Sequence, residues 1–546
     1  MTKPTRYTRQ QIESFVKNGV WKTTISSLWD RNAGEYPLLP AIADTTQEYT
    51  WAEALTWIDR VALGLIEMGM QRDEVLMAQL PNSVELHLLR VACEKAGILC
   101  LPVLTNMRES EIKYIAGYTD AAALVISDEF RGFNYTDMVS RIRDELPKLK
   151  HILTIEDRSR DSVVPLGSLA RKERNNPDVL ESRRYRPEDV SIVCLTSGST
   201  GFPKFVEYPA GACASGGRYL ADALGLTGSD IVAAIAPASR GPNVAVYYSA
   251  PQVAARMVMV PWLGAREALK AIEQKRVTVA CLVPTQLALM LAEFERQPVD
   301  LSSLRLWVCA GSQLSPSLVA GVERRMGGTV INQYGAVDFG AITVTRPEDP
   351  FTVRAFSAGS PRLGVDVRIN NDNGAEAEKG DVGEVLAKGT NAASGYYRDE
   401  DATDKAWDGE GWYATGDLGK IDGDGNLVIV GRKKEVIIRG GQNIYPAEME
   451  SLLITHPEIV SSAVIAMPDP LMGEKTCAYL VLNGSKSLTL EDLTVFLKKK
   501  NIAPFKIPER VEIVDRLPTI SDGQKIDKRA LAQDIISKLK QEEISR

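Results

Sequence analysis

Short apolar runs alternate with helical periodicity through most of the 546-residue chain. Val75–Gln79 has the length and composition of a buried strand, and apolar residues at helical spacing follow it from about Ser83 to Lys95. The same order recurs further along, with strands predicted at 98–103, 121–126, 151–155, 190–195, 277–283, 304–309 and 329–333 and helices at 286–295 and 315–326. Strands that alternate with crossover helices predict an α/β fold of layered, largely parallel sheets.

A different pattern begins near Lys434. It predicts strands at 426–430, 436–439, 459–466 and 476–482 and helices at 446–454 and 493–497. Pro446 suits the first turn of a helix, and Thr489 with Asp492 resembles a capping pair. We therefore expect a large N-terminal domain, residues 1–433, and a small α+β C-terminal domain, residues 434–546. The Asn-, Asp- and Gly-rich segment 370–384 is predicted to be a hairpin and loop.

Composition narrows the class of protein. Hydrophobic residues make up 44% and charged residues 25%, which is typical of a globular protein, and the net charge of −7 disfavours nucleic acid and anionic lipid as partners. The polar start of the chain does not resemble a signal peptide, and no apolar run is long enough to span a membrane. We expect a cytoplasmic protein; its oligomeric state is not readable from the sequence.

Cysteine and histidine usage restricts the chemistry. The seven cysteines are odd in number and scattered, and they lack a CxxC pair, which favours reduced core thiols over disulfides or zinc. The histidines are His87, His151 and His456, and each is expected at the surface or at a helix end. So few histidines argue against a histidine-based triad or a multi-histidine metal site. The chemistry must therefore work without a histidine base.

The strongest local signal follows the strand predicted at 190–195. It is a loop whose glycines and hydroxyls end in a cation: Thr196, Ser197, Gly198, Ser199, Thr200, Gly201 and Lys204. Glycines let backbone N–H groups approach an anion, and hydroxyls add donors, so the loop suits a polyphosphate. It is not a GxxxxGK[ST] loop and does not imply the usual P-loop fold. Alone, such a loop is more often a simple connection.

Further motifs follow this loop in a fixed order. They are Lys95-Ala96-Gly97, the loop itself, Ala310-Gly311-Ser312, Asn332–Asp338, Gly383-Glu384, Gly395-Tyr396-Tyr397, Gly411–Leu418, Gly431–Glu435, Gly440-Gly441, Pro446–Glu450 and Gly523–Lys528. In this order they resemble the superfamily of adenylate-forming enzymes, which comprises acyl-CoA synthetases, aryl-acid adenylating enzymes, peptide-synthetase adenylation domains and luciferases. The resemblance covers nearly the whole chain. It implies ATP/AMP, Mg²⁺ and coenzyme A as cofactors and a small carboxylic acid as substrate.

The resemblance assigns the nucleotide site. Asp417 would accept hydrogen bonds from both ribose hydroxyls, for which an acceptor-only carboxylate is suited, and Arg432 would lie near the ribose and phosphate. Other nucleotide contacts would come from the loop residues and from Gly311, Ser312, Gln313, Asn332, Gln333, Tyr334 and Gly335. Without that context, Asp417 would be interpreted as a turn aspartate and Tyr334 as a core aromatic residue.

The resemblance also names the catalytic groups, Lys525, Thr200 and Lys204. Lys525 would bridge the acid's carboxylate and the α-phosphate, where negative charge concentrates. No general base is needed, since a carboxylic acid is already ionised at neutral pH. The loop before Lys525 is one residue longer than usual, which leaves Lys528 as an alternative alignment. Asp338 stands where the family has a glutamate that holds Mg²⁺ together with Thr200, so a water-bridged or displaced ion is expected.

A rotation between domains is implied as well. Lys434 matches the hinge position of the family. In one conformation Lys525 would serve adenylation. In the other, Gly440 and Gly441 would approach the site and open a path for the thiol that attacks the acyl-adenylate.

The acid pocket is expected around Ser239, Arg240 and Gly241. Gly241 stands where relatives that use 2-hydroxybenzoates have an asparagine, so we expect a cyclic, aromatic or short acid without that hydroxyl. Arg240 could be a gate, or it could bind CoA phosphates or a second carboxylate. The leading function is an acyl-CoA ligase. It could form the thioester with ATP or run in reverse and make ATP from acyl-CoA, AMP and pyrophosphate. The alternatives are an aryl-acid adenylating enzyme that loads a carrier protein and a non-catalytic nucleotide-binding descendant.

Overall fold

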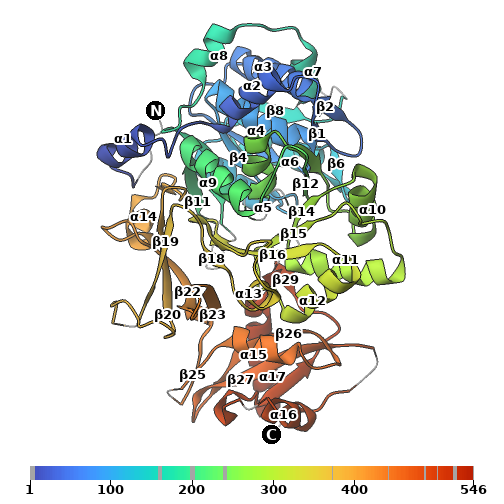
Figure 1. Ribbon diagram of the computed structural model, residues 1–546, viewed down its shortest axis with the longest axis vertical. Helices are drawn as coiled ribbons and strands as arrows, with labels where there is room; N and C mark the ends of the chain where they lie inside the picture. The colour runs from blue at the N-terminus through green and yellow to red at the C-terminus, as the bar shows by residue number, and fades with distance from the viewer. Residues whose placement is uncertain are drawn as a thin grey trace.

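The computed structural model describes residues 6–157, 163–196, 203–237, 241, 243–371, 373–440, 442–484, 487–500, 502–520 and 525–544. In Figure 1 the N-terminal half forms the upper body, a small sheet lies below it, and the C-terminal residues form a separate lower lobe. Several predicted site residues lie outside the described residues: Ser197, Gly198, Ser199, Thr200, Gly201, Ser239, Arg240 and Gly441.

An eight-stranded sheet is built mostly from strands of the first half of the chain. Its order is β21 (Gly395–Tyr396), β11 (Phe205–Pro209), β10 (Val190–Leu195), β4 (Leu99–Pro102), β3 (Val75–Gln79), β5 (Ala123–Ile126), β8 (His151–Thr154) and β9 (Val163–Pro165). From β10 to β9 all pairs are parallel, and β11 and β21 pair antiparallel at one edge. The strands alternate with helices, as predicted.

A nine-stranded sheet forms the second layer. Its order is β18 (Ser360–Pro361), β17 (Gly340–Val344), β16 (Thr329–Ala336), β15 (Leu306–Ala310), β14 (Val279–Leu282), β12 (Ile231–Ala234), β13 (Arg256–Met259), β1 (Pro40–Ala43) and β2 (Glu48–Thr50). The pairs from β16 to β1 are parallel, and the outer pairs are antiparallel. The largely parallel α/β architecture is confirmed.

Helix α4 (Val84–Ala96) lies inside this body. The side chain of Ser83 accepts from the Leu86 amide at its start, and Gly97 ends it with φ 67°. Every residue from Leu86 to Ala96 is buried, because its neighbours cover it on all sides. A surface position for His87 is therefore wrong, since only 2% of this residue is exposed, although it does lie in the first turn of the helix.

The remaining helices of the large domain cover the sheets or connect them. They are α1 (Arg9–Lys17), α2 (Ile25–Glu35), α3 (Trp51–Glu67), α5 (Glu109–Thr119), α6 (Tyr135–Ile142), α7 (Leu166–Arg171), α8 (Pro177–Arg183), α9 (Ala210–Ala223), α10 (Ala265–Lys275), α11 (Pro284–Arg296), α12 (Pro316–Arg325), α13 (Phe351–Phe356) and α14 (Glu400–Ala406). A π-helix, η2 (Ala245–Ser249), and a 3₁₀ turn, η3 (Ala250–Val253), precede β13. Short elements are η1 (Arg143–Glu145) and the hairpin β6 (Glu129–Phe130) and β7 (Phe133–Asn134).

A four-stranded sheet connects the two domains. Its strands are β19 (Val365–Asn370), β20 (Gly383–Gly389), β22 (Tyr413–Ile421) and β23 (Leu427–Arg432), all paired antiparallel. The hairpin predicted at 370–384 is confirmed, because β19 and β20 flank it. Asp417 on β22 lies opposite Arg432 on β23 in the register.

The C-terminal lobe has its own sheet and core. Its strands are β24 (Ile437–Arg439), β25 (Gln442–Ile444), β26 (Ile459–Asp469), β27 (Gly473–Leu482) and β28 (Arg510–Ile513), with the pair β29 (Thr519–Ile520) and β30 (Lys525–Ile526). Its helices are η4 (Lys433–Glu435), α15 (Pro446–Leu453), α16 (Leu490–Lys498), η5 (Pro504–Lys506) and α17 (Lys528–Ile544). Pro446 opens α15 and Thr489 forms a capping box with Asp492, as predicted.

Two general features follow from the same packing. All seven cysteines are free and buried, as expected of core thiols. Within the described parts of the chain, no helix has the length and apolarity needed to cross a membrane.

Candidate active site

An acidic corner lies where β22 and β23 pair. Arg432 Nε donates to Asp417 Oδ1 at 2.8 Å, and the hydroxyl of Tyr334 donates to Asp417 Oδ2 at 2.7 Å. The Asp417 side chain is only 8% exposed, whereas that of Arg432 is about half exposed. Burial, followed by the charge of Asp417, raises the pKa of Tyr334 well above its ordinary value, so its hydroxyl remains a donor. The corner thus presents a fixed carboxylate beside a cation.

Lys525 comes to this corner from the C-terminal lobe. Burial, followed by the charge of Arg432, lowers the pKa of Lys525, while Asp417, Asp338 and Glu435 oppose the shift. Three of these four groups belong to the large domain. Lys525 is therefore within electrostatic range of the corner.

Lys528 has a different environment. Its Nζ lies 2.9 Å from Glu435 and 2.9 Å from Glu450, both in the C-terminal lobe. Burial lowers its pKa, but these two carboxylates outweigh burial and raise it. Of the two lysines that the sequence left open, Lys525 is the one whose pKa is affected by the charges of the corner.

Asp338 and the ends of the phosphate loop lie on one side of the site. Burial, followed by Asp338, raises the pKa of Tyr396, whose hydroxyl hydrogen-bonds to Asp338. The Nζ of Lys204 lies 4.3 Å from the centre of the Tyr396 ring. The loop ends are joined, since the Lys204 amide donates to Thr196 Oγ1 and the Thr196 amide donates to the Lys204 carbonyl, both at 3.0 Å. Thr196, Lys204 and Asp338 are thus held in one region.

Three of the predicted nucleotide contacts, Gly311, Gln333 and Gly335, lie on or directly after strands β15 and β16 of the nine-stranded sheet. Gly311 follows β15 with φ 97°, where a side chain would be strained. A Cβ on Gly335 would lie 2.2 Å from the Gly340 carbonyl oxygen, so only glycine fits β16 at this point. Gln333 is buried and its Oε1 has no hydrogen-bond partner among the described residues.

Two of the predicted nucleotide contacts have other partners. Asn332 donates its Nδ2 to the Ser357 carbonyl at 2.9 Å. Gln313 donates its Nε2 to Ser451 Oγ on α15 at 2.8 Å, which joins the large domain to the C-terminal lobe. No sequence pattern indicates this contact, because its partners are far apart in the chain. Ser312 is half-buried beside Gln313.

Of the predicted acid pocket, the structure describes only Gly241. Two residues on, Asn243 is buried and donates its Nδ2 to the carbonyls of Ala236 and Pro237 at 2.8 and 3.1 Å. The side-chain amide of Asn243 therefore ties its backbone to that of Ala236 and Pro237.

The predicted hinge lies in a short exposed connection. Lys434 is exposed in the 3₁₀ turn η4, which follows Arg432 of the acidic corner and leads to β24. Lys433 Nζ lies 2.7 Å from Glu384 of β20, whereas Glu435 pairs with Lys528 of the C-terminal lobe. Neighbouring residues on either side of Lys434 are thus tied to different domains. Gly440 has φ 55° and donates its amide to the Met472 carbonyl at 2.8 Å.

Comparison with known proteins agrees with this geometry. Residues 29–397 match the model of the family described as AMP-binding enzyme, and residues 448–524 match AMP-binding enzyme C-terminal domain. The chain is 28% identical to the medium-chain fatty-acid–CoA ligase of Escherichia coli (strain K12), over 98% of this chain and 95% of that one. It is 29% identical to the 2,3-dihydroxybenzoate-AMP ligase of Bacillus subtilis (strain 168), over 96% of each chain.

A solved structure shares the whole architecture. The anthranilate CoA ligase AuaEII in complex with anthranoyl-AMP superposes with a TM-score of 0.85 at 25% identity, over 94% of this chain and 98% of that one. The large α/β domain and the small C-terminal domain are therefore those of adenylate-forming enzymes. The chain belongs to the AMP-binding enzyme family, as an AMP-forming acid–thiol ligase.

Proposed function

We propose that this ligase activates a carboxylic acid that lacks a 2-hydroxyl group and transfers the acyl group to coenzyme A. One observation carries the catalytic assignment: the pKa of Lys525, from the C-terminal lobe, responds to the charges of Arg432, Asp417 and Asp338 of the large domain. Arg432 is already paired with Asp417. Lys525 has no ion pair among the described residues, so its charge is available to an incoming anion.

In the first step, a carboxylate oxygen of the acid attacks the α-phosphorus of ATP. The new bond is the acyl–oxygen–phosphorus link, and the α–β phosphoanhydride bond breaks to release pyrophosphate. Lys525 stabilises the charge that builds up between the carboxylate and the α-phosphate, and Lys204 acts on the outer phosphates with Thr200. Asp417 accepts hydrogen bonds from the ribose hydroxyls, while Arg432 holds that carboxylate in place.

The donor set near the phosphates fits Mg²⁺. Asp338 offers one carboxylate, fixed by the Tyr396 hydroxyl, and Mg²⁺ is commonly held by one or two carboxylates, substrate phosphates and water. Asp338 and Thr200 would hold the ion, which neutralises phosphate charge when bound. Asp338 is shorter than glutamate, and this favours contact through a water.

In the second step, a thiolate attacks the acyl carbonyl and AMP leaves. We infer that the C-terminal lobe rotates about Lys434 between the steps, which removes Lys525 and brings Gly440 and Gly441 toward the site. The division of partners on either side of Lys434 supports this pivot. CoA is favoured because the chain is similar to CoA ligases.

The acid is proposed to be cyclic, aromatic or short, without a neighbouring hydroxyl. Gly241 offers no side chain to such a hydroxyl, and the Nδ2 of Asn243 is committed to two backbone carbonyls. A pocket without that polar partner gains little from a hydroxyl. The free, buried cysteines suit a reducing compartment, which supports the cytoplasm as the place of action.

Pyrophosphate release tests the proposal. A panel of acids, with salicylate included, is supplied with ATP and Mg²⁺ in the presence and absence of CoA. CoA-dependent turnover with an acid that lacks the 2-hydroxyl supports the proposal, and preference for salicylate overturns the acid class. A burst near one equivalent that ignores CoA points to carrier-protein loading, and no release with any acid points to a non-catalytic protein.

A further inference from the structure

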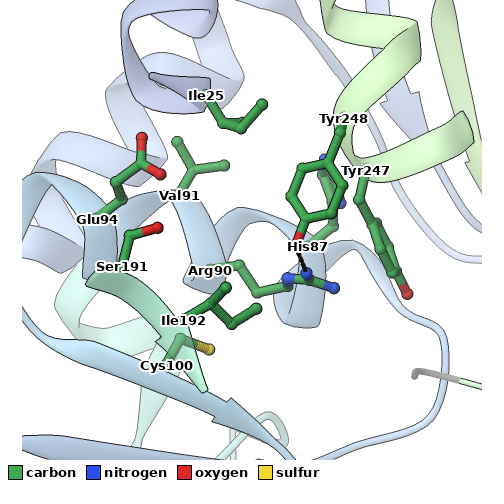
Figure 2. Close-up of a pocket in the computed structure, with 10 residues that line it drawn as sticks. All are labelled: Ile25, His87, Arg90, Val91, Glu94, Cys100, Ser191, Ile192, Tyr247 and Tyr248. Atoms are coloured by element: carbon green, nitrogen blue, oxygen red, sulfur yellow. Dashed lines mark hydrogen bonds between the residues drawn. The ribbon is translucent and has the colours of Figure 1, made fainter. Parts of the chain in front are cut away.

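A small cavity lies in the interior of the large domain, away from the acidic corner (Figure 2). Its volume is about 30 Å³, which is room for one or two waters or a single small ion. The wall is made by α4, by β4 and β10 of the eight-stranded sheet, by α2 and by the π-helix η2. The lining residues are Ile25, His87, Arg90, Val91, Glu94, Cys100, Ser191, Ile192, Tyr247 and Tyr248.

Arg90 brings a positive charge into this cavity. It is 8% exposed; its Nη2 donates to the Tyr248 hydroxyl at 2.6 Å, and its guanidinium lies 4.1 Å from the centre of the Tyr247 ring. Nη1 is buried and has no hydrogen-bond partner among the described residues. No described carboxylate lies within ion-pair distance of Arg90. A guanidinium stays charged, and burying it without a counter-charge is costly.

His87 adds a second unsatisfied polar group. It is 2% exposed and stacks on Tyr247 at a centroid distance of 5.1 Å, and both of its ring nitrogens lack partners in the described part of the chain. Burial, followed by the charge of Arg90, lowers the pKa of His87 to about 3. The imidazole is therefore neutral near pH 7 and carries one N–H that can donate.

Glu94, the acidic residue in the cavity wall, does not neutralise the charge of Arg90. Glu94 Oε1 accepts from the Ser26 amide at 2.6 Å, and the cation that acts on its charge is Arg184. In Figure 2 Glu94 lies on the opposite side of the cavity from the guanidinium. The cavity is thus a buried donor site with a positive charge, an N–H donor and little room.

We propose that this cavity binds one small monovalent inorganic anion, of the size of chloride, on the guanidinium of Arg90. Such an anion would neutralise the buried charge and accept from Nη1 of Arg90 and from His87. A tetrahedral divalent anion such as sulfate is too large for the space. The occupied site would also hold η2, since Tyr247 and Tyr248 belong to that helix.

This placement links the anion to the acid-binding segment. The π-helix begins two residues after Asn243, whose side chain closes the segment at Ala236 and Pro237. Single π-helical turns are frequent at functional sites. An anion that fixes η2 would therefore lower the KM for the acid.

The test uses the full-length enzyme in chloride-free gluconate buffer at constant ionic strength. Chloride and bromide should raise the melting temperature in a saturable way, by about 2 °C or more, because a ligand that binds only the folded state stabilises it. Sulfate should not. Crystals grown with bromide should show an anomalous peak beside Arg90.

Two variants sharpen the result. Arg90→Met should abolish the halide effect, whereas Arg266→Met should retain it, because Arg266 is half-buried on α10, outside the cavity lining, and donates to the Gln297 carbonyl. Equal melting in chloride, sulfate and gluconate, with water instead of bromide in the cavity, would overturn the proposal. If Arg90→Met fails to fold, the bromide map of the unaltered enzyme decides the question.

Discussion

Replacing Lys525 by methionine should block adenylation and spare thioester formation. Two unit charges about 4 Å apart interact by about 4 kcal/mol at an effective dielectric constant of 20. Loss of one donor at a developing charge costs roughly 3–4 kcal/mol. Because Arg432 is already paired with Asp417, no other charge at the corner replaces Lys525. We expect ATP–pyrophosphate exchange to fall roughly 100- to 1,000-fold.

Lys528→Met is the matched control, because it removes the same charge three residues away. Lys528 pairs with Glu435 and Glu450 and not with the corner, so ATP–pyrophosphate exchange should fall less than about 10-fold. Loss of these partly buried ion pairs should lower the melting temperature. Conversion of synthetic acyl-adenylate and CoA to thioester should persist in Lys525→Met. Exchange that survives in Lys525→Met and is lost in Lys528→Met would refute the assignment.

Three further outcomes are expected. Asp417→Asn removes the charge of the corner, so the KM for ATP should rise roughly 10- to 100-fold in the exchange assay, and an unchanged KM would exclude a ribose contact. Gly335→Ala places a methyl against the Gly340 carbonyl and should destabilise the fold by about 1–3 kcal/mol in thermal unfolding, whereas Gly117→Ala, with open space around it, should not. The pKa of Lys525 is lowered, and a lysine carries its charge only at pH values below its pKa. The adenylation rate should therefore decline with rising pH at pH values below the ordinary pKa of lysine. A flat pH–rate profile in that range would argue against a catalytic ammonium.

Much of the fold could be predicted because the strands of parallel sheets are buried on both faces. Such strands leave continuous apolar runs, and the predicted run at 75–79 coincides with β3. The interior helix α4 was harder to interpret. A helix that is covered on all sides has no solvent face to which polar residues can be assigned, so a surface position for His87 is a wrong expectation.

For the site, the sequence could name the groups but could not choose between near neighbours. Lys525 and Lys528 differ only in spacing along the chain, and the choice depends on carboxylates that lie about 80 to 110 residues away: Glu435 and Glu450 beside Lys528, and Asp417 beside Lys525. The Gln313–Ser451 contact and the Arg90 cavity depend likewise on the packing of distant elements. Such choices require the tertiary structure.

Strand β23 has one consequence for how the two half-reactions communicate. Arg432, its last residue, pairs with Asp417, the carboxylate proposed to bind the ribose, and the proposed pivot at Lys434 comes two residues later. The proposed nucleotide contact and the proposed domain rotation would therefore both act on this one strand end. Selection for tighter nucleotide binding at this strand would then also alter the rate of the proposed domain rotation, so the two properties would evolve together.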